Sequence, residues 1–171
     1  ELLIPKNTVD KLKSLGMSGD VQIRHSKTGA VFITEDFEVY TRLIEGEYFK
    51  YQTMFKELPL HTVVSRMVLL DAMTRAKMCT EERCPVRFEL DGNSLSLSIK
   101  DKPTDYHETV ELQEDMAEAL TIGFDARLVL ETLKAFDCEN VGVSFGGPKM
   151  PMIVEAEDSD FKTIVLPVAI N

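Results

Sequence analysis

The side chains that most often carry catalysis or hold metal ions lie far apart along this chain. Its histidines are His25, His61 and His107. None of them has another ligand residue at the spacing of a metal motif, and none sits beside a recognisable nucleophile motif. Each is therefore predicted to be an ordinary surface or strand histidine. We expect no metal, no cofactor and no catalytic group.

The cysteines indicate neither a disulfide framework nor a zinc site. Cys79, Cys84 and Cys138 are an odd number of thiols, and they form no Cys-x-x-Cys motif. Zinc sites and secreted disulfide scaffolds show cysteines paired at short, regular spacings. These three are expected to be reduced and partly buried.

Two further segments resemble ligand sites only superficially. Gly146-Gly147-Pro148 lacks the Lys-Ser/Thr pair and the helix that follow the glycines of a P-loop, so it is predicted to connect two strands. The acidic run at 155–160 is typical of an exposed hairpin turn rather than of a magnesium site. The chain is therefore predicted not to be an enzyme.

The charge balance limits how the chain can meet nucleic acid. Its 171 residues carry a formal net charge of −10, within an ordinary globular composition of 44% hydrophobic and 28% charged residues. Proteins that grip nucleic acid tightly do so through many Lys and Arg contacts to phosphate. Any contact with DNA is expected to be loose or local.

The elements that must position these residues recur three times in one order, which is a short apolar strand, a helix and three further strands. The strands are expected at 2–4, 21–23, 30–33 and 39–44 in the first copy, at 62–64, 86–90, 95–99 and 109–112 in the second, and at 120–124, 141–145, 152–154 and 163–168 in the third. Asp91-Gly92-Asn93 predicts a tight hairpin in the second copy.

The expected helices share an apolar, acidic, variable, apolar pattern. It occurs as Val9-Asp10-Lys11-Leu12, Leu70-Asp71-Ala72-Met73 and Leu130-Glu131-Thr132-Leu133. A fixed long period is a fold-level signature, although amphipathic helices also resemble one another by chance. One copy cannot cover its own sheet, so two are expected to pair, sheet edge to sheet edge and helix beside helix. The prediction is an α+β fold of one and a half domains.

No segment suggests a membrane or secreted protein. No apolar run approaches the roughly 18 residues needed to cross a bilayer. Glu1-Leu2-Leu3-Ile4-Pro5 lacks the basic start and long apolar stretch of a signal peptide. A soluble, cytoplasmic protein without a membrane partner is expected.

Four segments, in order and at the right spacing, resemble the bacterial DNA sliding clamp family, the β subunits of DNA polymerase III. They are Leu3-Ile4-Pro5-Lys6, the run R-L-I-E-G-E-Y-F-K-Y at 42–51, Ile122-Gly123-Phe124-Asp125 with Leu130 and Leu133, and Ile164-Val165-Leu166-Pro167-Val168. The resemblance covers essentially the whole chain. Monomers of that family have three domains built from six repeats, and two monomers close into a ring around duplex DNA.

The resemblance implies a function without catalysis. The chain would be a segment of a processivity factor that holds DNA polymerase III on duplex DNA loosely and without sequence preference. Polymerases, repair factors and the clamp loader would be its protein partners, and the full-length protein would form a homodimeric ring. The clamp fold also implies that residues 1–56 are the second half of the middle domain and residues 57–171 the C-terminal domain.

Three sets of residues follow from the resemblance. The hydrophobic groove that docks partner peptides would be formed by Phe49, Thr53, Met54, Ile164, Val165, Leu166, Pro167 and Val168. The residues facing DNA would be the helix cations Lys6, Lys13, Arg66, Arg75, Lys77, Arg127 and Lys134. The face that meets the partner subunit would include Met78, Cys79, Glu108 and Glu111.

Each set has a plainer alternative. The groove residues would then be core, the cations ordinary surface charges, and the end of the second helix packed only on its own sheet. The segment 163–168 favours the groove, because it is apolar on both faces whereas the last strand of an antiparallel sheet normally exposes a polar face. An apolar cover such as a partner peptide is expected, and Met54 suits an adaptable site.

Two other functions stay open from the sequence. A clamp-fold binding module, or a divergent paralogue that does not encircle DNA, would keep the groove without the ring. An unrecognised small enzyme would need a pocket with convergent titratable groups. A gene that encodes six repeats would favour the clamp over the module.

Overall fold

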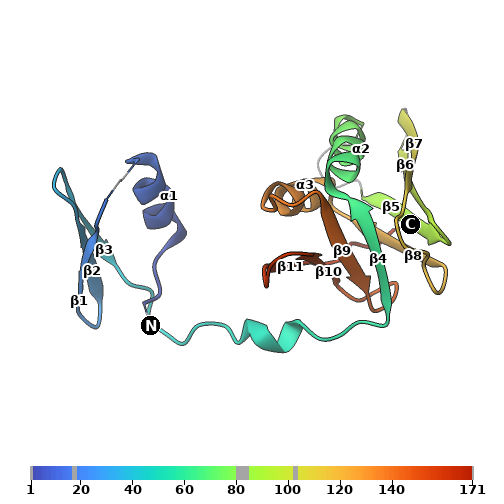
Figure 1. Ribbon diagram of the computed structural model, residues 1–171. Coiled ribbons are helices and arrows are strands. Elements are labelled where there is room, and N and C mark those ends of the chain that lie inside the picture. Colours follow the sequence, from blue (N-terminus) through green and yellow to red (C-terminus); the bar gives the residue numbers. More distant parts are fainter. Residues whose placement is uncertain (1, 17–18, 80–84, 102–103, 171) are drawn as a thin grey trace. The chain divides into compact units, whose positions relative to one another are not determined.

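The computed structural model describes residues 2–16, 19–79, 85–101 and 104–170, and the chain divides into two compact units (Figure 1). The first unit is Glu1–Gln52 and the second is Thr53–Asn171, with the 3-10 helix η1 (Tyr51–Met54) at the division. Cys84 falls outside the described residues, while Cys79 and Cys138 are free and half-buried. Within the described ranges, no helix has the length and apolar character required to cross a membrane.

The first unit is a helix followed by a three-stranded antiparallel sheet. Its elements are α1 (Lys6–Ser14), β1 (Gln22–His25), β2 (Gly29–Ile33) and β3 (Glu38–Arg42), and the sheet order is β1-β2-β3. A hydrogen bond of 2.7 Å between the hydroxyls of Thr8 and Thr41 ties the helix to β3. Every residue of β1 is exposed, so solvent reaches both faces of this edge strand.

The second unit contains the same order of elements twice. The second copy is β4 (Leu60–Ser65), α2 (Arg66–Met78), β5 (Val86–Asp91), β6 (Ser94–Asp101) and β7 (Thr104–Glu111). The third copy is β8 (Leu120–Phe124), α3 (Ala126–Lys134), β9 (Asn140–Phe145), β10 (Met152–Ala156) and β11 (Lys162–Val165). The predicted α+β clamp fold, with its repeated strand, helix and three strands, is confirmed.

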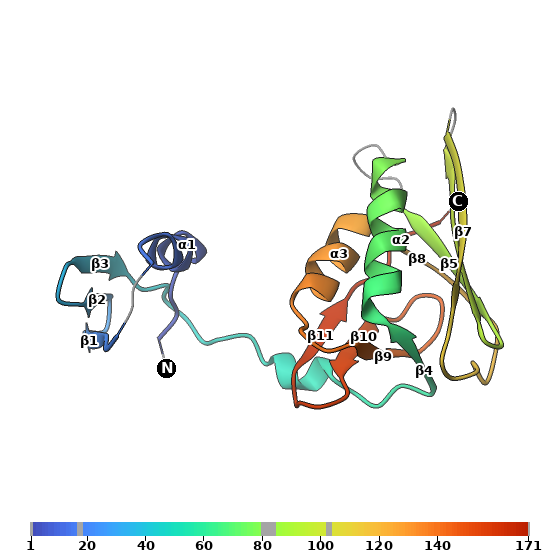
Figure 2. The same ribbon diagram turned by 45° about the horizontal axis from the view of Figure 1, so that its top comes forward.

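The two copies exchange their first strands. β4 joins the sheet of the third copy, in the order β11-β10-β9-β4, and β8 joins that of the second copy, in the order β7-β6-β5-β8. The pairing is antiparallel, with Val64 opposite Val141 in one sheet and Phe124 opposite Val86 in the other. α2 and α3 pack side by side (Figures 1 and 2). Each sheet therefore depends on both copies.

One hydrophobic core serves both copies. β5 alternates in burial, and Val86, Phe88 and Leu90 point inward. Phe88 meets Phe124 of β8 edge to face, with ring centroids 5.2 Å apart. Burying apolar surface on both sides of such contacts is the main force that holds the copies together. The two helices bury equivalent positions in this core, namely Leu69 and Met73 in α2 and Val129 and Leu133 in α3, and Phe136 just after α3 takes the place of Ala76 in α2.

Local sequence explains two of the connections. β5 and β6 are joined through Gly92, whose φ of 54° lies in the left-handed region that favours glycine. The hairpin predicted there is confirmed. The acidic run begins at the end of β10 and continues through the turn to β11, and Glu155 pairs with Lys162 across the two strands at 2.6 Å.

The segment after the last strand of each copy returns to that copy's own first strand. The N–H of Gln113 donates to the carbonyl of Val63 in β4 over 2.8 Å. The N–H of Val168 donates to the carbonyl of Gly123 in β8 over the same distance. β4 and β8 are edge strands, so the two returning segments cover edges that would otherwise be open to pairing.

The bounds of several expected strands shift by a few residues, and two strands differ more deeply. Residues 2–4 form no strand, because a first strand pairs with the sheet of another copy and the first unit contains only one. Leu3 instead accepts a backbone hydrogen bond of 2.9 Å from Ile44. The strand expected at 163–168 ends at Val165, since Pro167 has no N–H with which to continue a ladder.

Candidate functional site

The chain that follows β11 exposes apolar side chains. Leu166 is 55% exposed and Val168 is 37% exposed, and Pro167 between them is half-buried. Val165, at the end of β11, is only 3% exposed and belongs to the core. Among the residues expected in a groove, Val165 thus packs inward, while the next three reach the surface. Residues 166–170 are called the C-terminal segment below.

The second copy contains an equivalent of this segment. Val63 and Gly123 each lie two residues before the N-cap residue of the following helix, so they occupy equivalent positions. Gln113 donates to Val63 as Val168 donates to Gly123, which makes Gln113 the counterpart of Val168. The returning segment of each copy therefore makes the same backbone hydrogen bond to the first strand of that copy.

The side chains of the two equivalent segments differ in character. Glu111 and Gln113 are exposed and polar, whereas their counterparts Leu166 and Val168 are exposed and apolar. The second copy shows that this backbone path needs no apolar side chain at either position. Exposed apolar groups that the fold does not require are typical of binding surfaces, and burying them stabilises a complex by roughly 25 cal/mol per Å². The C-terminal segment is our candidate site.

The other residues expected in the groove lie in several places. Thr53 is exposed and Met54 half-buried in η1, and Ile164 is half-buried on β11. Phe49 belongs to the first unit and is 65% exposed. Residues 55–58, which follow Met54, line a cavity of about 350 Å³ with residues of β10 and β11. The connector after Met54 thus lies against the sheet that leads into the C-terminal segment.

Several of the cations expected to face DNA have partners in this chain. Lys13, Lys77 and Lys134 are exposed on their helices, and each of these helices also carries an acid, namely Asp10, Asp71 and Glu131. The helix surface is therefore mixed in charge, and any attraction to phosphate is weak. The pairs are Arg66 with the carbonyl of Cys138 (2.7 Å), Lys6 with Asp10 (2.7 Å), Arg75 with Glu108 (2.5 Å) and Arg127 with Asp125 (3.5 Å).

The residues expected at a subunit interface lie at the end of α2 and on β7. Met78 is 81% exposed, and Cys79 after it is half-buried. Glu111 is exposed on β7, which is the outermost strand of its sheet, and Glu108 lies on the same strand. The four residues thus flank an exposed helix end and a sheet edge, where another chain can pair.

Glu108 also belongs to a hydrogen-bonded cluster between β7 and α2. Its carboxylate accepts bonds from Nε and Nη2 of Arg75, at 2.9 and 2.5 Å, and from the hydroxyl of Tyr106 at 2.6 Å. That hydroxyl also lies 2.8 Å from the carbonyl of Ala72. The bonds from Arg75 and Tyr106 lower the pKa of Glu108 to about 2, and burial together with Glu108 raises the pKa of Tyr106.

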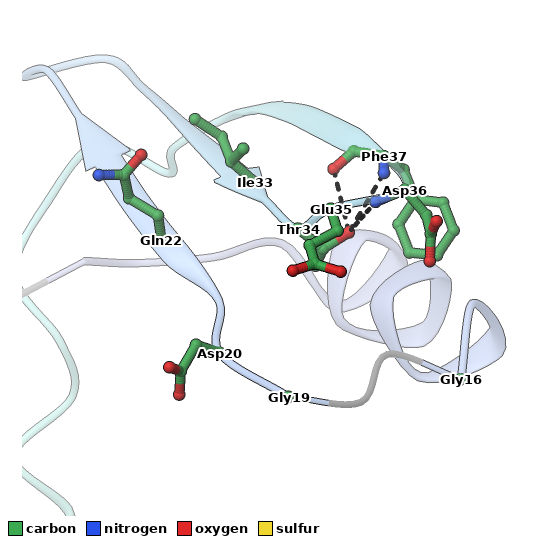
Figure 3. A pocket seen from close by; sticks show the side chains of 9 residues that line it. All are labelled: Gly16, Gly19, Asp20, Gln22, Ile33, Thr34, Glu35, Asp36 and Phe37. Carbon is green, nitrogen blue, oxygen red and sulfur yellow. Dashed lines mark hydrogen bonds between the residues drawn. The ribbon is translucent and has the colours of Figure 1, made fainter.

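A hollow in the first unit gathers acidic residues without forming a metal site. Its volume is about 530 Å³, and Asp20, Glu35 and Asp36 lie on its wall. Asp20 points away from the other two carboxylates (Figure 3). The hydroxyl of Thr34 is bonded within its own loop, to backbone groups of Asp36 and Phe37. In the part of the chain that the structure describes, no three His, Cys, Asp or Glu residues are grouped to hold a metal ion.

His61 meets two partners that the sequence did not predict, because they lie on other elements. Its Nδ1 is 3.0 Å from Oγ of Ser144, and its Nε2 is 3.9 Å from Oε2 of Glu114. Ser144 is 9% exposed and lies on β9, which is paired on both sides. A serine so enclosed is poorly placed to attack a substrate, so the grouping is a structural one. His25 and His107 are exposed on β1 and β7.

Comparison with known proteins identifies relatives of the whole arrangement. Residues 55–169 match the family described as DNA polymerase III beta subunit, C-terminal domain. The beta sliding clamp of Streptococcus pneumoniae serotype 4 is 27% identical over 157 residues, which are 88% of this chain and 42% of that protein. The beta sliding clamp of Streptomyces coelicolor is 28% identical over 185 residues, 99% of this chain and 49% of that protein. The chain thus spans less than half the length of these relatives.

Solved structures share the fold at low sequence identity. The beta subunit from DNA polymerase of Streptococcus pyogenes has a TM-score of 0.87 at 24% identity, over 98% of this chain and 47% of that one. The sliding clamp of Bartonella birtlesii, bound to griselimycin, has a TM-score of 0.90 at 20% identity, over 99% and 47%. Because the family match at 55–169 covers well over half of the residues, the chain belongs to the DNA polymerase III beta subunit family.

Proposed function

We propose that this chain is a segment of a DNA sliding clamp, a processivity factor that holds DNA polymerase III on duplex DNA and catalyses no reaction itself. Membership of the beta subunit family and the exchanged-strand fold support the proposal. The observation that carries it is the C-terminal segment, which exposes Leu166 and Val168 where the equivalent segment of the second copy is polar. A replication protein of this kind works in the bacterial cytoplasm.

The proposal includes a domain assignment. Residues 57–171 form the C-terminal domain of the clamp, and residues 1–56 form the second half of its middle domain. The exposed edge of β1 supports the half-domain, because its equivalents β5 and β9 are each paired with the first strand of another copy. A further repeat would supply such a strand to β1 and take residues 2–4 into its own sheet.

The helices form the DNA-facing side in this proposal. α2 and α3 pack side by side and carry exposed cations such as Lys134 and Arg127. Their mixed charge suits a ring, because a closed ring stays on DNA by topology and needs only weak, sequence-blind attraction. Two full-length subunits would close that ring through the end of α2 and the edge of β7, at Met78, Cys79, Glu108 and Glu111.

The C-terminal segment contributes the apolar wall of a groove that binds peptides of DNA polymerase III, repair factors and the clamp loader. We assign Leu166, Pro167 and Val168 to that wall, and Ile164, Thr53 and Met54 to its surroundings. Val165 supports the groove from inside the core. The griselimycin-bound clamp of Bartonella birtlesii makes that compound a second probe for this chain.

Peptide binding by a Leu166→Asp variant tests the proposal. The probe is a fluorescent peptide that carries the clamp-binding motif of a bacterial replicative polymerase, measured by anisotropy. We expect the Kd to rise at least about 10-fold, because a buried aspartate would lose its hydration without gaining a partner. Thermal unfolding should shift by no more than a few degrees, since Leu166 is 55% exposed.

The matched control is Met67→Asp, which charges a residue that is 48% exposed on α2. It should leave peptide binding unchanged. Equal peptide affinity of the Leu166→Asp variant and the unaltered chain would rule out the groove. A large drop in the unfolding temperature of the variant would also rule it out, because Leu166 would then be a core residue. A binding module that does not encircle DNA would share the groove, so a second experiment is needed to distinguish it from a clamp. The full-length protein is loaded on circular and on linearised duplex DNA. A clamp should be retained longer on the circle, whereas a binding module should show no difference.

A further inference from the structure

The C-terminal segment packs against a strand position that has no side chain. The side chain of Ile170 lies over Gly123 of β8, so closely that a Cβ added to this glycine would overlap Cγ2 of the isoleucine. The same Cβ would lie 2.8 Å from the carbonyl oxygen of Val168. The conformation of the segment therefore depends on the absence of a side chain at residue 123.

The second copy solves the same packing problem in the opposite way. The counterpart of Gly123 is Val63, which is 7% exposed, and the counterpart of Ile170 is Asp115, which is exposed. In the second copy the apolar side chain at this place belongs to the strand. In the third copy it belongs to the returning segment. At this pair of positions each copy thus has one apolar side chain, on the strand in the second copy and on the returning segment in the third.

We propose that Gly123 and Ile170 form an anchor that positions the C-terminal segment for partner binding. This inference rests on the proposed groove and identifies two residues that fix the conformation of its apolar wall. Gly123 leaves a hole, and Ile170 fills it from the segment. Neither residue was expected in the site from the sequence, and neither needs to touch the partner.

The anchor explains how three exposed residues can keep a defined shape. Val165 is held in the core before the segment, at 3% exposure, and Ile170 is held over β8 after it. The hydrogen bond from the N–H of Val168 to Gly123 fixes the middle. A segment held at both ends loses little conformational freedom on binding, which raises its affinity for a partner. Polar residues at 170 would remove one of the two attachments.

The test uses Gly123→Ala, Ile170→Ala and the double variant, all in the full chain. Peptide affinity is measured by anisotropy with the fluorescent polymerase peptide described above, and the amide hydrogen exchange of Val168 is measured by NMR. We expect each single variant to raise the Kd by about 10-fold and to lower the protection of the Val168 amide. The double variant should be no weaker than the Gly123→Ala variant, because the two residues act through one contact.

Gly142→Ala, on the central strand β9, is the matched control. A Cβ there would meet the side chains of His61 and Glu155 at 3.0 and 3.2 Å, away from the C-terminal segment. It should alter neither peptide affinity nor exchange at Val168.

Unchanged protection of the Val168 amide in both single variants would overturn the anchor, and so would additive losses of affinity in the double variant. Should Gly123→Ala prevent folding, Ile170→Ala still decides, because that residue is half-buried at the end of the segment. If the unaltered chain binds no peptide, the proposed groove fails, whereas loss of Val168 protection in the variants would still support the anchor. The two failures are thus distinguishable.

Discussion

Arg75, Tyr106 and Glu108 show that residues from two expected sites can be joined in one cluster. Arg75 was assigned to a DNA-facing set and Glu108 to a subunit interface, yet the two share a bidentate contact. The charge of Arg75 is thereby compensated within the chain, so it contributes little to any attraction for phosphate. The cluster instead joins α2 to β7, and the hydroxyl of Tyr106 extends it to the helix backbone.

We predict that Glu108→Gln removes an acid-sensitive part of the stability of the second unit. The folded-state pKa of Glu108 is lowered from 4.5 to about 2 by Arg75 and Tyr106. The carboxylate therefore stabilises the fold fully above pH 4.5, and this contribution is lost as the pH falls towards 2. Urea unfolding between pH 2 and 7 should show a steeper loss of stability for the unaltered chain than for the variant. Parallel curves would contradict the prediction, and Glu111→Gln on the same strand is the control.

The candidate site was only partly predictable at the residue scale. The apolar character of 164–168 indicated a binding segment, but the alternation of a strand could not show that β11 ends at Val165 and that this residue turns inward. Gly123 and Ile170 escaped notice because their contact joins residues 47 positions apart and depends on a missing side chain. A comparison of the two copies, position by position, was the signal that could have found them.

At the scale of elements, the order of strands and helices was predictable and the membership of the sheets was not. Hydrophobic alternation specifies which face of a strand is buried and says nothing about which edge it joins. Nothing in the sequence of β4 indicates that it pairs with β9 of the next copy. The failure of residues 2–4 to form a strand has the same cause, since the apolar pattern is present and the partner sheet is not.

We predict that the second and third copies unfold as one cooperative unit. Phe88→Ala in β5 should lower the free energy of unfolding by about 3–5 kcal/mol, as large cavities in aromatic cores do. The loss should reach the third copy, because Phe88 packs on Phe124 of β8. Urea titration followed by circular dichroism, with hydrogen exchange in β5 and β9, should show a single shifted midpoint for both strands. Separate midpoints would contradict a shared core, and Val68→Ala, at an exposed position of α2, is the control substitution.

At the scale of the whole molecule, the net charge favours a protein that encircles DNA over one that binds DNA through many phosphate contacts. The chain carries a net charge of −10, and several helix cations are already paired with acceptors of the same chain. Long-range repulsion between such a chain and duplex DNA opposes stable binding to an open surface. The ring proposed above would avoid the difficulty, because dissociation would then require an interface to open and would not depend on the strength of phosphate contacts.

We predict that the 171-residue chain binds linear duplex DNA only weakly. At physiological salt the Kd should be above roughly 100 μM, the weak end of non-specific binding, and residual binding at low salt should vanish as salt is raised. Fluorescence anisotropy with a linear duplex at several salt concentrations measures this. Lys134→Glu on α3 should reduce the low-salt signal more than Lys149→Glu in the connection between β9 and β10. Tight binding at physiological salt would contradict a loosely held ring.

The exchange of first strands also determines when each strand can pair during synthesis of the polypeptide. Val64 of β4 pairs with Val141 of β9, 77 positions later. A ribosome that adds about 5–20 residues per second needs roughly 4–15 s to cover that interval. During this time β5 and β6 can close their local hairpin, whereas β4 has emerged without its partner and leaves Leu60 and Val64 uncovered. The nascent chain is therefore most prone to aggregation, and most dependent on chaperones, after its second copy has been synthesised and before its third is complete.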